Sequence, residues 1–283
     1  ALRKALDLAA QDGTTVTCDP PGLIKVNSTV YIPQRITGTS IRGFLMDFYG
    51  STFVGQGRGT GTIFETGTGV LSTGGATNFG QIDESGAALH YGTIIAGARF
   101  RACQYVFRAF NFVKGCKIKD WFVEDVDHVL LAERCFYLEV ENCHAQIAAI
   151  TAGHVLFDFT EENNAIVVSG CEAAGGLGNT AGISYRFTGA SSVTFVGNTA
   201  EAVDKGLVFN GTIRGFNANS NYYEAITTTA IDGTAGGSKE FTVDNSWFLD
   251  CAEAIDCIQW ISGTWGLQIT LRAQAELSES RMH

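Results

Sequence analysis

The stretch EVENCH at residues 139–144 is followed by VVSGCE at 167–172 and by TFVGNT at 194–199. Each is a short run with an apolar residue at its centre that ends at Gly or Asn. The same form recurs in KIKDWF (117–122), NANSNY (217–222), TVDNSW (242–247) and QITLRA (268–273). The apolar centres run from Ile118 through Val140, Val168, Phe195, Ala218 and Val243 to Ile269. They recur about every 25 residues, and such near-constant spacing indicates a repeat fold.

A second series of short strands recurs later in each repeat. It comprises VLFDF (155–159), ISYRF (183–187), GLVFN (206–210), AIDG (230–233) and AIDC (254–257). Two strand series in constant phase, at about 25 residues per turn, predict a parallel β-solenoid with several strands per coil. A β-sandwich would instead show hairpins with Asn-Gly or Asp-Gly turns at closer spacing. The signatures of leucine-rich repeats and β-propellers are also missing, so we expect an all-β chain.

The segment 1–13 differs from the rest of the chain. Leu2, Ala5, Leu6 and Ala9 fall on one helical face, and Asp12-Gly13 ends the pattern. We expect an α-helix over 1–13 and strands thereafter.

The repeat also predicts which residues stack, since equivalent positions on successive coils lie about 4.8 Å apart. Small or Asn-like residues mark a corner, where we expect side-chain amides to form a ladder inside the solenoid: Asp120, Asn142, Gly170, Gly197, Ser220 and Asn245. Cys143 and Cys171 stack one position later. Aromatic residues of the second series should form an interior ladder: Val155, Phe157 and Phe159 with Ile183, Tyr185 and Phe187, and then with Leu207 and Phe209.

Composition excludes several functions. The chain has 283 residues, a net charge of −10, 34 Gly and only 3 Pro. We therefore expect no nucleic-acid partner and no membrane insertion, because neither a basic footprint nor an apolar run of about 18 residues is present. The eight Cys are expected to be free and buried, and the five His share no column, so we expect no metal site and no cofactor.

The beginning of the chain carries a family resemblance. ALRKALDLAAQDG (1–13) leads into TTVTCDPPGLIKVNSTVYIP (14–33), and STFVGQGRGTGTIFETG follows at 51–67. This order of helix, strand, Pro-Gly turn and strand resembles the right-handed, single-stranded parallel β-helix of the pectin-lyase-like superfamily, in particular phage tailspikes and capsule depolymerases. The Gly-rich GQGRGTG is followed by a strand at 62–64 and not by a helix, which excludes a dinucleotide-binding loop.

The resemblance implies a fold more than a chemistry. The motifs of galacturonan hydrolases are not intact here. Asp125-Val126-Asp127-His128 is only loosely similar to a pectate-lyase motif, and the Arg-x-Pro site of those lyases is excluded because all three Pro lie near the N-terminus. The motif-poor tailspikes fit best. They imply a homotrimer made in the host cytoplasm without a signal peptide and carried on the virion tail. Outward apolar residues would support the trimer: Phe110, Phe112, Trp121 and Phe122.

Glycoside hydrolysis needs two carboxyl groups, about 5–5.5 Å apart for retention and about 6.5–9.5 Å for inversion. Stacking places Glu124, Gln146, Ala174, Glu201, Glu224 and Leu249 in one outward column. Glu201 and Glu224 are therefore the expected catalytic pair, with Asp204 and Asp250 nearby. Tyr222, Tyr223 and Trp247 are expected to stack against sugars, and mutual repulsion should raise the pKa of one carboxyl.

Other charged residues offer weaker candidates. Asp232 and Asp256 form a second-choice carboxylate pair, with Trp260 and Trp265 downstream, and Glu139 and Glu141 share an outward face. Asp158 should stack against Arg186 as a structural ion pair. Arg186 or Arg214 could orient an acidic sugar. For each of these the alternative is an ordinary solvated side chain.

The function expected from the resemblance and the carboxylates is hydrolysis of a bacterial surface glycan, such as capsule or O-antigen, by an endo-acting glycoside hydrolase. Two alternatives remain open: a non-catalytic receptor-binding or structural β-helix, and a polysaccharide lyase. We expect one β-helix domain over 1–271, with the helix at 1–13, initial coils at 14–75 and regular coils at 76–271. Residues 272–283 would be an exit segment, with the chain cut from a longer protein.

Overall fold

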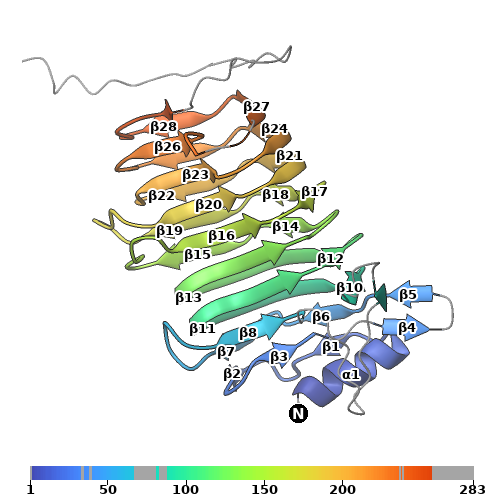
Figure 1. Ribbon diagram of the computed structural model, residues 1–283. Coiled ribbons are helices and arrows are strands. Elements are labelled where there is room, and N and C mark those ends of the chain that lie inside the picture. The colour runs from blue at the N-terminus through green and yellow to red at the C-terminus, as the bar shows by residue number, and fades with distance from the viewer. Residues whose placement is uncertain are drawn as a thin grey trace, which may run out of the picture.

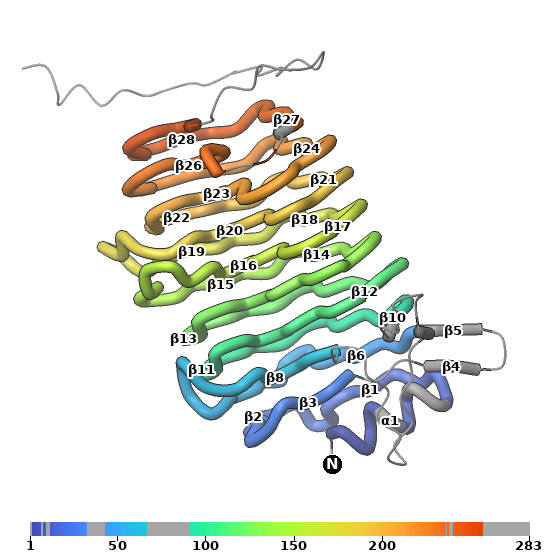
Figure 2. Tube along the Cα trace, in the orientation of Figure 1, coloured from blue at the N-terminus to red at the C-terminus, as the bar shows by residue number. Residues whose placement is uncertain are grey.

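The computed structural model describes residues 2–32, 35–37, 40–66, 81–82, 88–235, 237 and 239–256. It is an all-β parallel solenoid of about eight turns with one short helix at its N-terminal end, as the repeat predicts (Figure 1). The coils stack on one another along the whole described chain (Figure 2). Residues 257–283 are outside the described part, and with them the QITLRA segment, Cys257, Trp260, Trp265 and the expected exit segment.

Hydrogen bonds join 24 of the described strands into a continuous sheet, which bends into three faces. The first face contains β1 (Val16–Thr17), β6 (Leu45–Asp47), β14 (Glu139–Glu141), β18 (Val167–Ser169), β21 (Ala190–Val196), β24 (Ile213–Asn219) and β27 (Lys239–Asp244). The second contains β2 (Leu23–Lys25), β7 (Thr52–Val54), β15 (His144–Ile147), β19 (Glu172–Gly175), β22 (Thr199–Glu201), β25 (Tyr222–Glu224) and β28 (Trp247–Leu249). The third contains β3 (Val30–Tyr31), β8 (Thr62–Glu65), β16 (Val155–Thr160), β20 (Ile183–Phe187), β23 (Lys205–Phe209), β26 (Thr229–Asp232) and β29 (Ile255–Asp256).

Two long strands run around all three faces without a break. They are β11 (Ile94–Phe110) and β13 (Lys117–Glu133), which pair in parallel with each other and with the shorter strands of neighbouring coils. The remaining strands are short: β4 (Arg35–Thr37) with β5 (Ser40–Arg42), β9 (Gln81–Ile82) with β10 (Ala88–Tyr91) and β12 (Phe112–Val113), and β17 (Asn163–Asn164) against β21.

The predicted register is confirmed wherever the strands are described. Ile118 pairs with Val140, Val140 with Val168, and Val168 with Phe195. The same series continues through Ala218 to Val243. Because each coil repeats the last in parallel register, every outward position forms a column that runs along the molecule.

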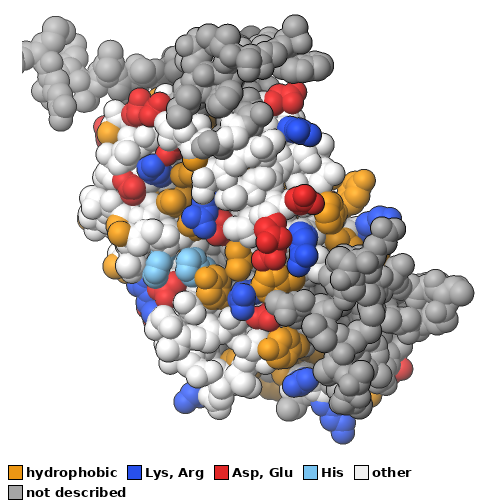
Figure 3. All heavy atoms as spheres, in the orientation of Figure 1, with side chains coloured by type: hydrophobic (Ala, Val, Ile, Leu, Met, Phe, Trp, Pro, Cys, Tyr) orange, Lys and Arg blue, Asp and Glu red, His pale blue; other side chains and the backbone are white. Residues whose placement is uncertain are grey.

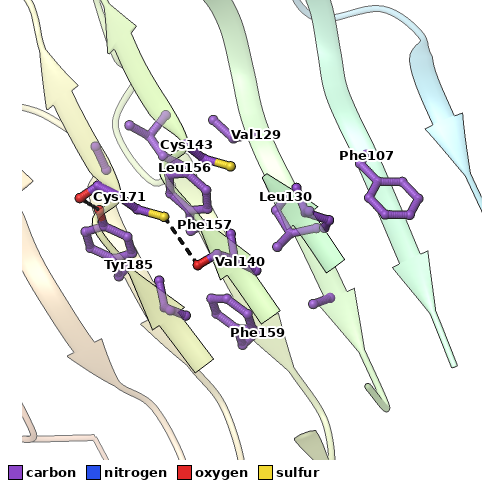
Figure 4. Close-up of a cluster of buried hydrophobic side chains, with 14 of the residues drawn as sticks. Phe107, Val129, Leu130, Val140, Cys143, Leu156, Phe157, Phe159, Cys171 and Tyr185 are labelled. Atoms are coloured by element: carbon purple, nitrogen blue, oxygen red, sulfur yellow. Dashed lines mark hydrogen bonds between the residues drawn. The ribbon is translucent and has the colours of Figure 1, made fainter. Parts of the chain in front are cut away.

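The core is a ladder of aromatic and small apolar side chains. Phe157 stacks on Tyr185 with ring centroids 5.2 Å apart, as expected (Figure 4). Phe159 likewise stacks on Phe187, with ring centroids 4.4 Å apart. Five of the seven described Cys are buried, including Cys143 and Cys171 in the core. Burial raises the pKa of the Cys135 thiol to about 12, so this thiol is unreactive at neutral pH.

The N-terminal helix is confirmed as α1 (Leu2–Asp12). Leu6 and Ala9 are buried against the first strands, and Gly13 ends the helix in the left-handed region, with its N–H donated to the Ala9 carbonyl at 2.7 Å. The apolar face of α1 thus covers the end of the solenoid (Figure 1).

The corner column is confirmed, but the amide ladder lies elsewhere. All six predicted corner residues have φ between 47° and 64°: Asp120, Asn142, Gly170, Gly197, Ser220 and Asn245. The buried amides stand one position later, in the column of Cys143 and Cys171. There Asn198 donates its backbone N–H to the Asn221 side chain at 2.9 Å, and the Asn221 amide donates to the Phe195 carbonyl at 3.2 Å. A left-handed corner residue points outward, so the next residue enters the core.

Three of the four aromatic residues expected on the outside are buried, and that expectation was wrong. Phe110, Phe112 and Trp121 are at most 3 % exposed, and only Phe122 reaches the surface in part. The corner residues Asp120 and Asn111, both with positive φ, turn the chain so that Trp121 and Phe112 enter the core. The structure therefore removes the apolar surface that was offered as support for a trimer.

Candidate active-site face

The second face presents two outward columns of side chains. The first column runs through Leu23, Thr52, Arg99, Phe122, His144, Glu172, Thr199, Tyr222 and Trp247. The second runs through Lys25, Val54, Arg101, Glu124, Gln146, Ala174, Glu201, Glu224 and Leu249. The second column reproduces the predicted order from Glu124 to Leu249. The two columns therefore place carboxylates, aromatic rings and cations side by side on the second face.

Glu201 and Glu224 are direct neighbours on adjacent coils, at the ends of β22 and β25. Both side chains are half-buried. Burial raises the pKa of the Glu201 carboxyl above its ordinary value, and the charges of Glu224 and Glu172 raise it further. The neighbouring negative charges therefore disfavour ionisation of Glu201, which is the electrostatic arrangement expected of a general acid.

Tyr222 is in direct contact with this carboxylate pair. Its hydroxyl donates a hydrogen bond of 2.7 Å to Glu224 Oε2, which raises the pKa of the phenol to about 12. Trp247 follows Tyr222 in the same column and is 53 % exposed. Asp250 is exposed at the corner after β28, with φ 51°, and its charge adds to the rise in the pKa of Tyr222. The structure thus brings these predicted residues together around Glu224.

Tyr223 does not belong to the surface, and its expected role in sugar stacking was wrong. It is 1 % exposed and stacks on Phe248 inside the solenoid, with ring centroids 5.1 Å apart. Successive side chains of a strand point to opposite sides, so Tyr222 and Tyr223 cannot both face outward.

Asp204 lies beyond the corner at Ala202, on the edge of the third face. Its carboxylate accepts hydrogen bonds from the hydroxyls of Thr227 and Thr228, and its backbone N–H is donated to the Gly182 carbonyl at 3.0 Å. Asp204 is thus held by contacts with neighbouring residues on its own side of the corner, and none of these contacts involves Tyr222 or Glu224.

Comparison with protein-family models, with curated proteins and with solved structures finds no match to this chain.

The third face contains several ion pairs, and Figure 3 shows positively and negatively charged side chains scattered over the side of the molecule seen there. Arg186 donates two hydrogen bonds, of 2.9 and 2.6 Å, to the carboxylate of the buried Asp158, so the predicted ion pair is present. These hydrogen bonds raise the pKa of the Arg186 guanidinium. Lys205 lies 2.5 Å from Asp232, whose neighbour on the next coil is Asp256. Burial of Asp232 opposes ionisation, but the hydrogen bonds from Lys205 and Thr234 prevail and lower its pKa. Of the second-choice carboxylates, Asp232 is thus paired with a cation.

Arg214 lies apart from these pairs. It lines an open hollow beside β17, together with Glu162, Asn164, Ser191 and Thr212. This hollow is at the far end of the coil from Glu201, so Arg214 and the carboxylate pair belong to different surfaces.

Two features were missed by sequence reasoning. Glu172 lies on the second face one coil before Glu201, and it binds His144 Nδ1 at 3.1 Å and the Gln146 amide at 2.9 Å. Ala174 is in the predicted outward column, and Glu172 is two residues before it, so the alternation of side chains could have predicted that Glu172 also faces outward.

The other missed feature is a cluster on the third face. Asp127 is 5 % exposed and accepts hydrogen bonds from Arg58 Nε at 3.0 Å and the Gly59 N–H at 2.7 Å. The rings of His128 and His154 lie 5.0 Å apart beside it, and burial lowers the pKa of His128. The GQGRGTG loop is therefore fixed to the solenoid through Asp127. Among the described residues, no group of three or more His, Cys, Asp or Glu is arranged to hold a metal ion.

Proposed function

We propose that this protein is an endo-acting glycoside hydrolase that binds an extended polysaccharide along its second face. The observation that carries the proposal is the in-register pair of Glu201 and Glu224 on adjacent coils. Adjacent coils are about 4.8 Å apart, close to the separation of about 5–5.5 Å between the carboxyl groups of retaining glycosidases. The geometry therefore favours the retaining mechanism over inversion.

The surroundings of the two carboxyls suggest their roles. Glu201, with its raised pKa, is suited to protonate the oxygen of the leaving sugar. Glu224, which accepts the Tyr222 hydrogen bond, is suited to attack the anomeric carbon as the nucleophile. After the glycosyl-enzyme forms, Glu201 would take a proton from water, and the hydroxide would release the sugar from Glu224.

Aromatic side chains beside the pair support carbohydrate as the substrate. Trp247 is half exposed and Tyr222 is partly exposed in the same column. Such rings offer an apolar face to the C–H groups of a sugar and lose little conformational entropy on binding. We take the polymer to be a bacterial surface glycan and the protein to act as a phage tailspike, on the basis of the resemblance at its N-terminus.

The test replaces each carboxylate by its amide. We expect Glu201→Gln and Glu224→Gln each to lower the rate of depolymerisation about 10²–10⁴-fold, since each removes a proton donor or a nucleophile while keeping the side-chain shape. Size-exclusion chromatography of capsule or lipopolysaccharide incubated with the protein measures the fall in polymer size.

Glu124→Gln is the matched control. Glu124 faces outward in the same column but has Arg101 and Gln146 as neighbours, so its loss should leave the rate unchanged. Full activity in both Glu201→Gln and Glu224→Gln would refute the assignment. Binding without any cut by the wild type would favour a non-catalytic receptor-binding protein, and an ultraviolet-absorbing unsaturated product would favour a lyase.

A further inference from the structure

A hollow at the corner between the first and second faces lies in line with the carboxylate pair. Its lining includes Tyr49, Ser51, Arg99, Asp120 and Phe122. Arg99 and Phe122 belong to the same outward column as Thr199, which lies on the coil of Glu201. Four coil steps separate Arg99 from Thr199, which corresponds to about 19 Å along the solenoid.

Tyr49 gives this hollow a fixed aromatic wall. The ring is 51 % exposed, yet it lies flat against Gly97, where an added Cβ would come within 2.3 Å of the ring. Its hydroxyl donates a hydrogen bond to Asp120, which raises the pKa of the phenol to about 12. An exposed ring that is held at both ends can bind a sugar without first paying an ordering cost.

Arg99 supplies an unpaired cation beside that wall. Its guanidinium lies over the Phe122 ring, 4.8 Å from the centroid, and is exposed. Within the described chain no ion pair involves Arg99, nor its exposed neighbours Lys25 and Arg101 in the adjacent column. A stacked guanidinium keeps its planar fork free for a bidentate contact with a carboxylate.

The floor of the hollow contains an unsatisfied polar group. Ser51 is 1 % exposed, and its hydroxyl has no hydrogen-bond partner among the described residues. Asp120 already accepts from Tyr49 and from the Asn142 amide at 3.3 Å, with Lys119 Nζ at 3.9 Å. Asp120 therefore offers carboxylate oxygen atoms that suit the hydroxyl groups of a sugar, whereas the Ser51 hydroxyl follows the left-handed Gly50 and is closed to solvent.

The second face is therefore divided by charge, although the whole chain is acidic. Lys25, Arg99 and Arg101 stand toward its N-terminal end, and Glu172, Glu201 and Glu224 stand toward its C-terminal end. Carboxylates at the cleavage site alone would repel an acidic polymer, so the cations several coils away would provide the attraction that holds it.

We propose that the Tyr49–Arg99 hollow is a subsite for a uronate unit, and that the polysaccharide bound along the second face is acidic. The uronate carboxylate would meet the Arg99 guanidinium while the sugar ring lies against Tyr49. The subsite rests on the proposed function only in that the same polymer would reach Glu201 and Glu224.

The experiment measures binding and leaves cleavage aside. Alginate, polygalacturonate and hyaluronan are the acidic probes, and dextran and pullulan are the neutral ones, with affinity followed by surface plasmon resonance at low and moderate salt. We expect the protein to prefer at least one acidic polymer over the neutral pair, with affinity that falls as salt rises. Arg99→Gln should weaken that binding about tenfold, the loss of one charge-assisted bidentate contact.

Two further variants make the result decisive. Tyr49→Ala should also weaken binding, whereas Arg134→Gln, which removes the same charge just beyond the far end of β13, should not. Circular dichroism of each variant verifies folding. No preference for acidic polymers, or equal binding by Arg99→Gln and wild type, would overturn the subsite.

The subsite and the catalytic proposal fail separately. Glu224→Gln should bind the acidic polymer at least as tightly as wild type, because the hollow lies several coils away and the substitution removes a charge that repels the polymer. Binding that depends on Arg99 in a protein that never shortens the polymer would keep the subsite and refute the hydrolase. Cleavage of a neutral glycan at a rate that Arg99→Gln does not change would keep the hydrolase and refute the subsite.

Discussion

At the scale of single residues, the surroundings of the Glu201 carboxyl at the candidate site favour its protonated form. Burial raises its pKa first, followed by the charges of Glu224 and Glu172. A general acid must hold its proton at the working pH, so we expect activity to fall as pH rises through the raised pKa of Glu201. On a coil without acidic neighbours, burial alone would still raise the pKa of this carboxyl, but by less.

We predict that Glu224→Gln lowers the pKa of Glu201. The substitution removes a nearby negative charge, and a carboxyl ionises more readily without one. Side-chain carboxyl chemical shifts, followed by ¹³C NMR across a pH titration, measure this pKa in the folded protein. Glu172→Gln should produce a smaller fall in the same direction, while Glu139→Gln on the first face should produce none. An unchanged pKa in Glu224→Gln would mean that the two carboxyls do not interact.

At the scale of elements, the buried Asn198–Asn221 ladder joins successive corners. The Asn221 amide accepts the Asn198 backbone N–H at 2.9 Å and donates to the Phe195 carbonyl at 3.2 Å. The Asn198 amide likewise accepts the Cys171 N–H at 3.0 Å. Each Asn thus satisfies backbone groups that the turn would otherwise leave buried without partners.

We predict that Asn221→Ala destabilises the protein by about 1–3 kcal/mol, because it strands the Asn198 N–H and the Phe195 carbonyl inside the core. Asn217→Ala is the control, since Asn217 points outward from the same region of β24 and is exposed, and it should change stability by less than about 0.5 kcal/mol. Urea unfolding followed by circular dichroism gives both values. Equal stability of the two variants would show that the ladder contributes nothing.

The elements also show how far sequence reasoning reaches. Spacing alone predicted the outward column from Glu124 to Leu249, since the period of the coils is visible in the apolar centres. Spacing did not show that Tyr222 faces outward while Tyr223 is buried. That distinction requires both the alternation of side chains along a strand and the position of the preceding corner. Spacing could not find the contact of Tyr49 with Asp120, because the segment between β8 and β11 interrupts the period and hides the phase of the first coils.

At the scale of the whole molecule, the three faces carry different chemistry. The second face combines carboxylates with exposed aromatic rings, while the third is filled by ion pairs such as Arg186–Asp158. Neither is an extended apolar surface, and no helix in the described ranges is long and apolar enough to cross a membrane.

We predict a trimer in solution, following the resemblance to tailspikes, with a mass three times the 30.2 kDa of one chain. Analytical ultracentrifugation over a range of protein concentrations measures this mass. A single species with the mass of one chain at all concentrations would refute it.

The parallel register has a consequence for how such a protein can change over generations. One coil is a complete unit of about 25 residues whose ends meet the coils before and after it in the same way. Duplication of one coil between Arg99 and Glu201 would move the cation and the carboxylates apart by about 4.8 Å and leave each local environment intact. The distance between Arg99 and the carboxylates could thus change only in steps of one coil. Insertion or deletion of coils, by evolution or by design, would adapt the protein to glycans with longer or shorter repeat units.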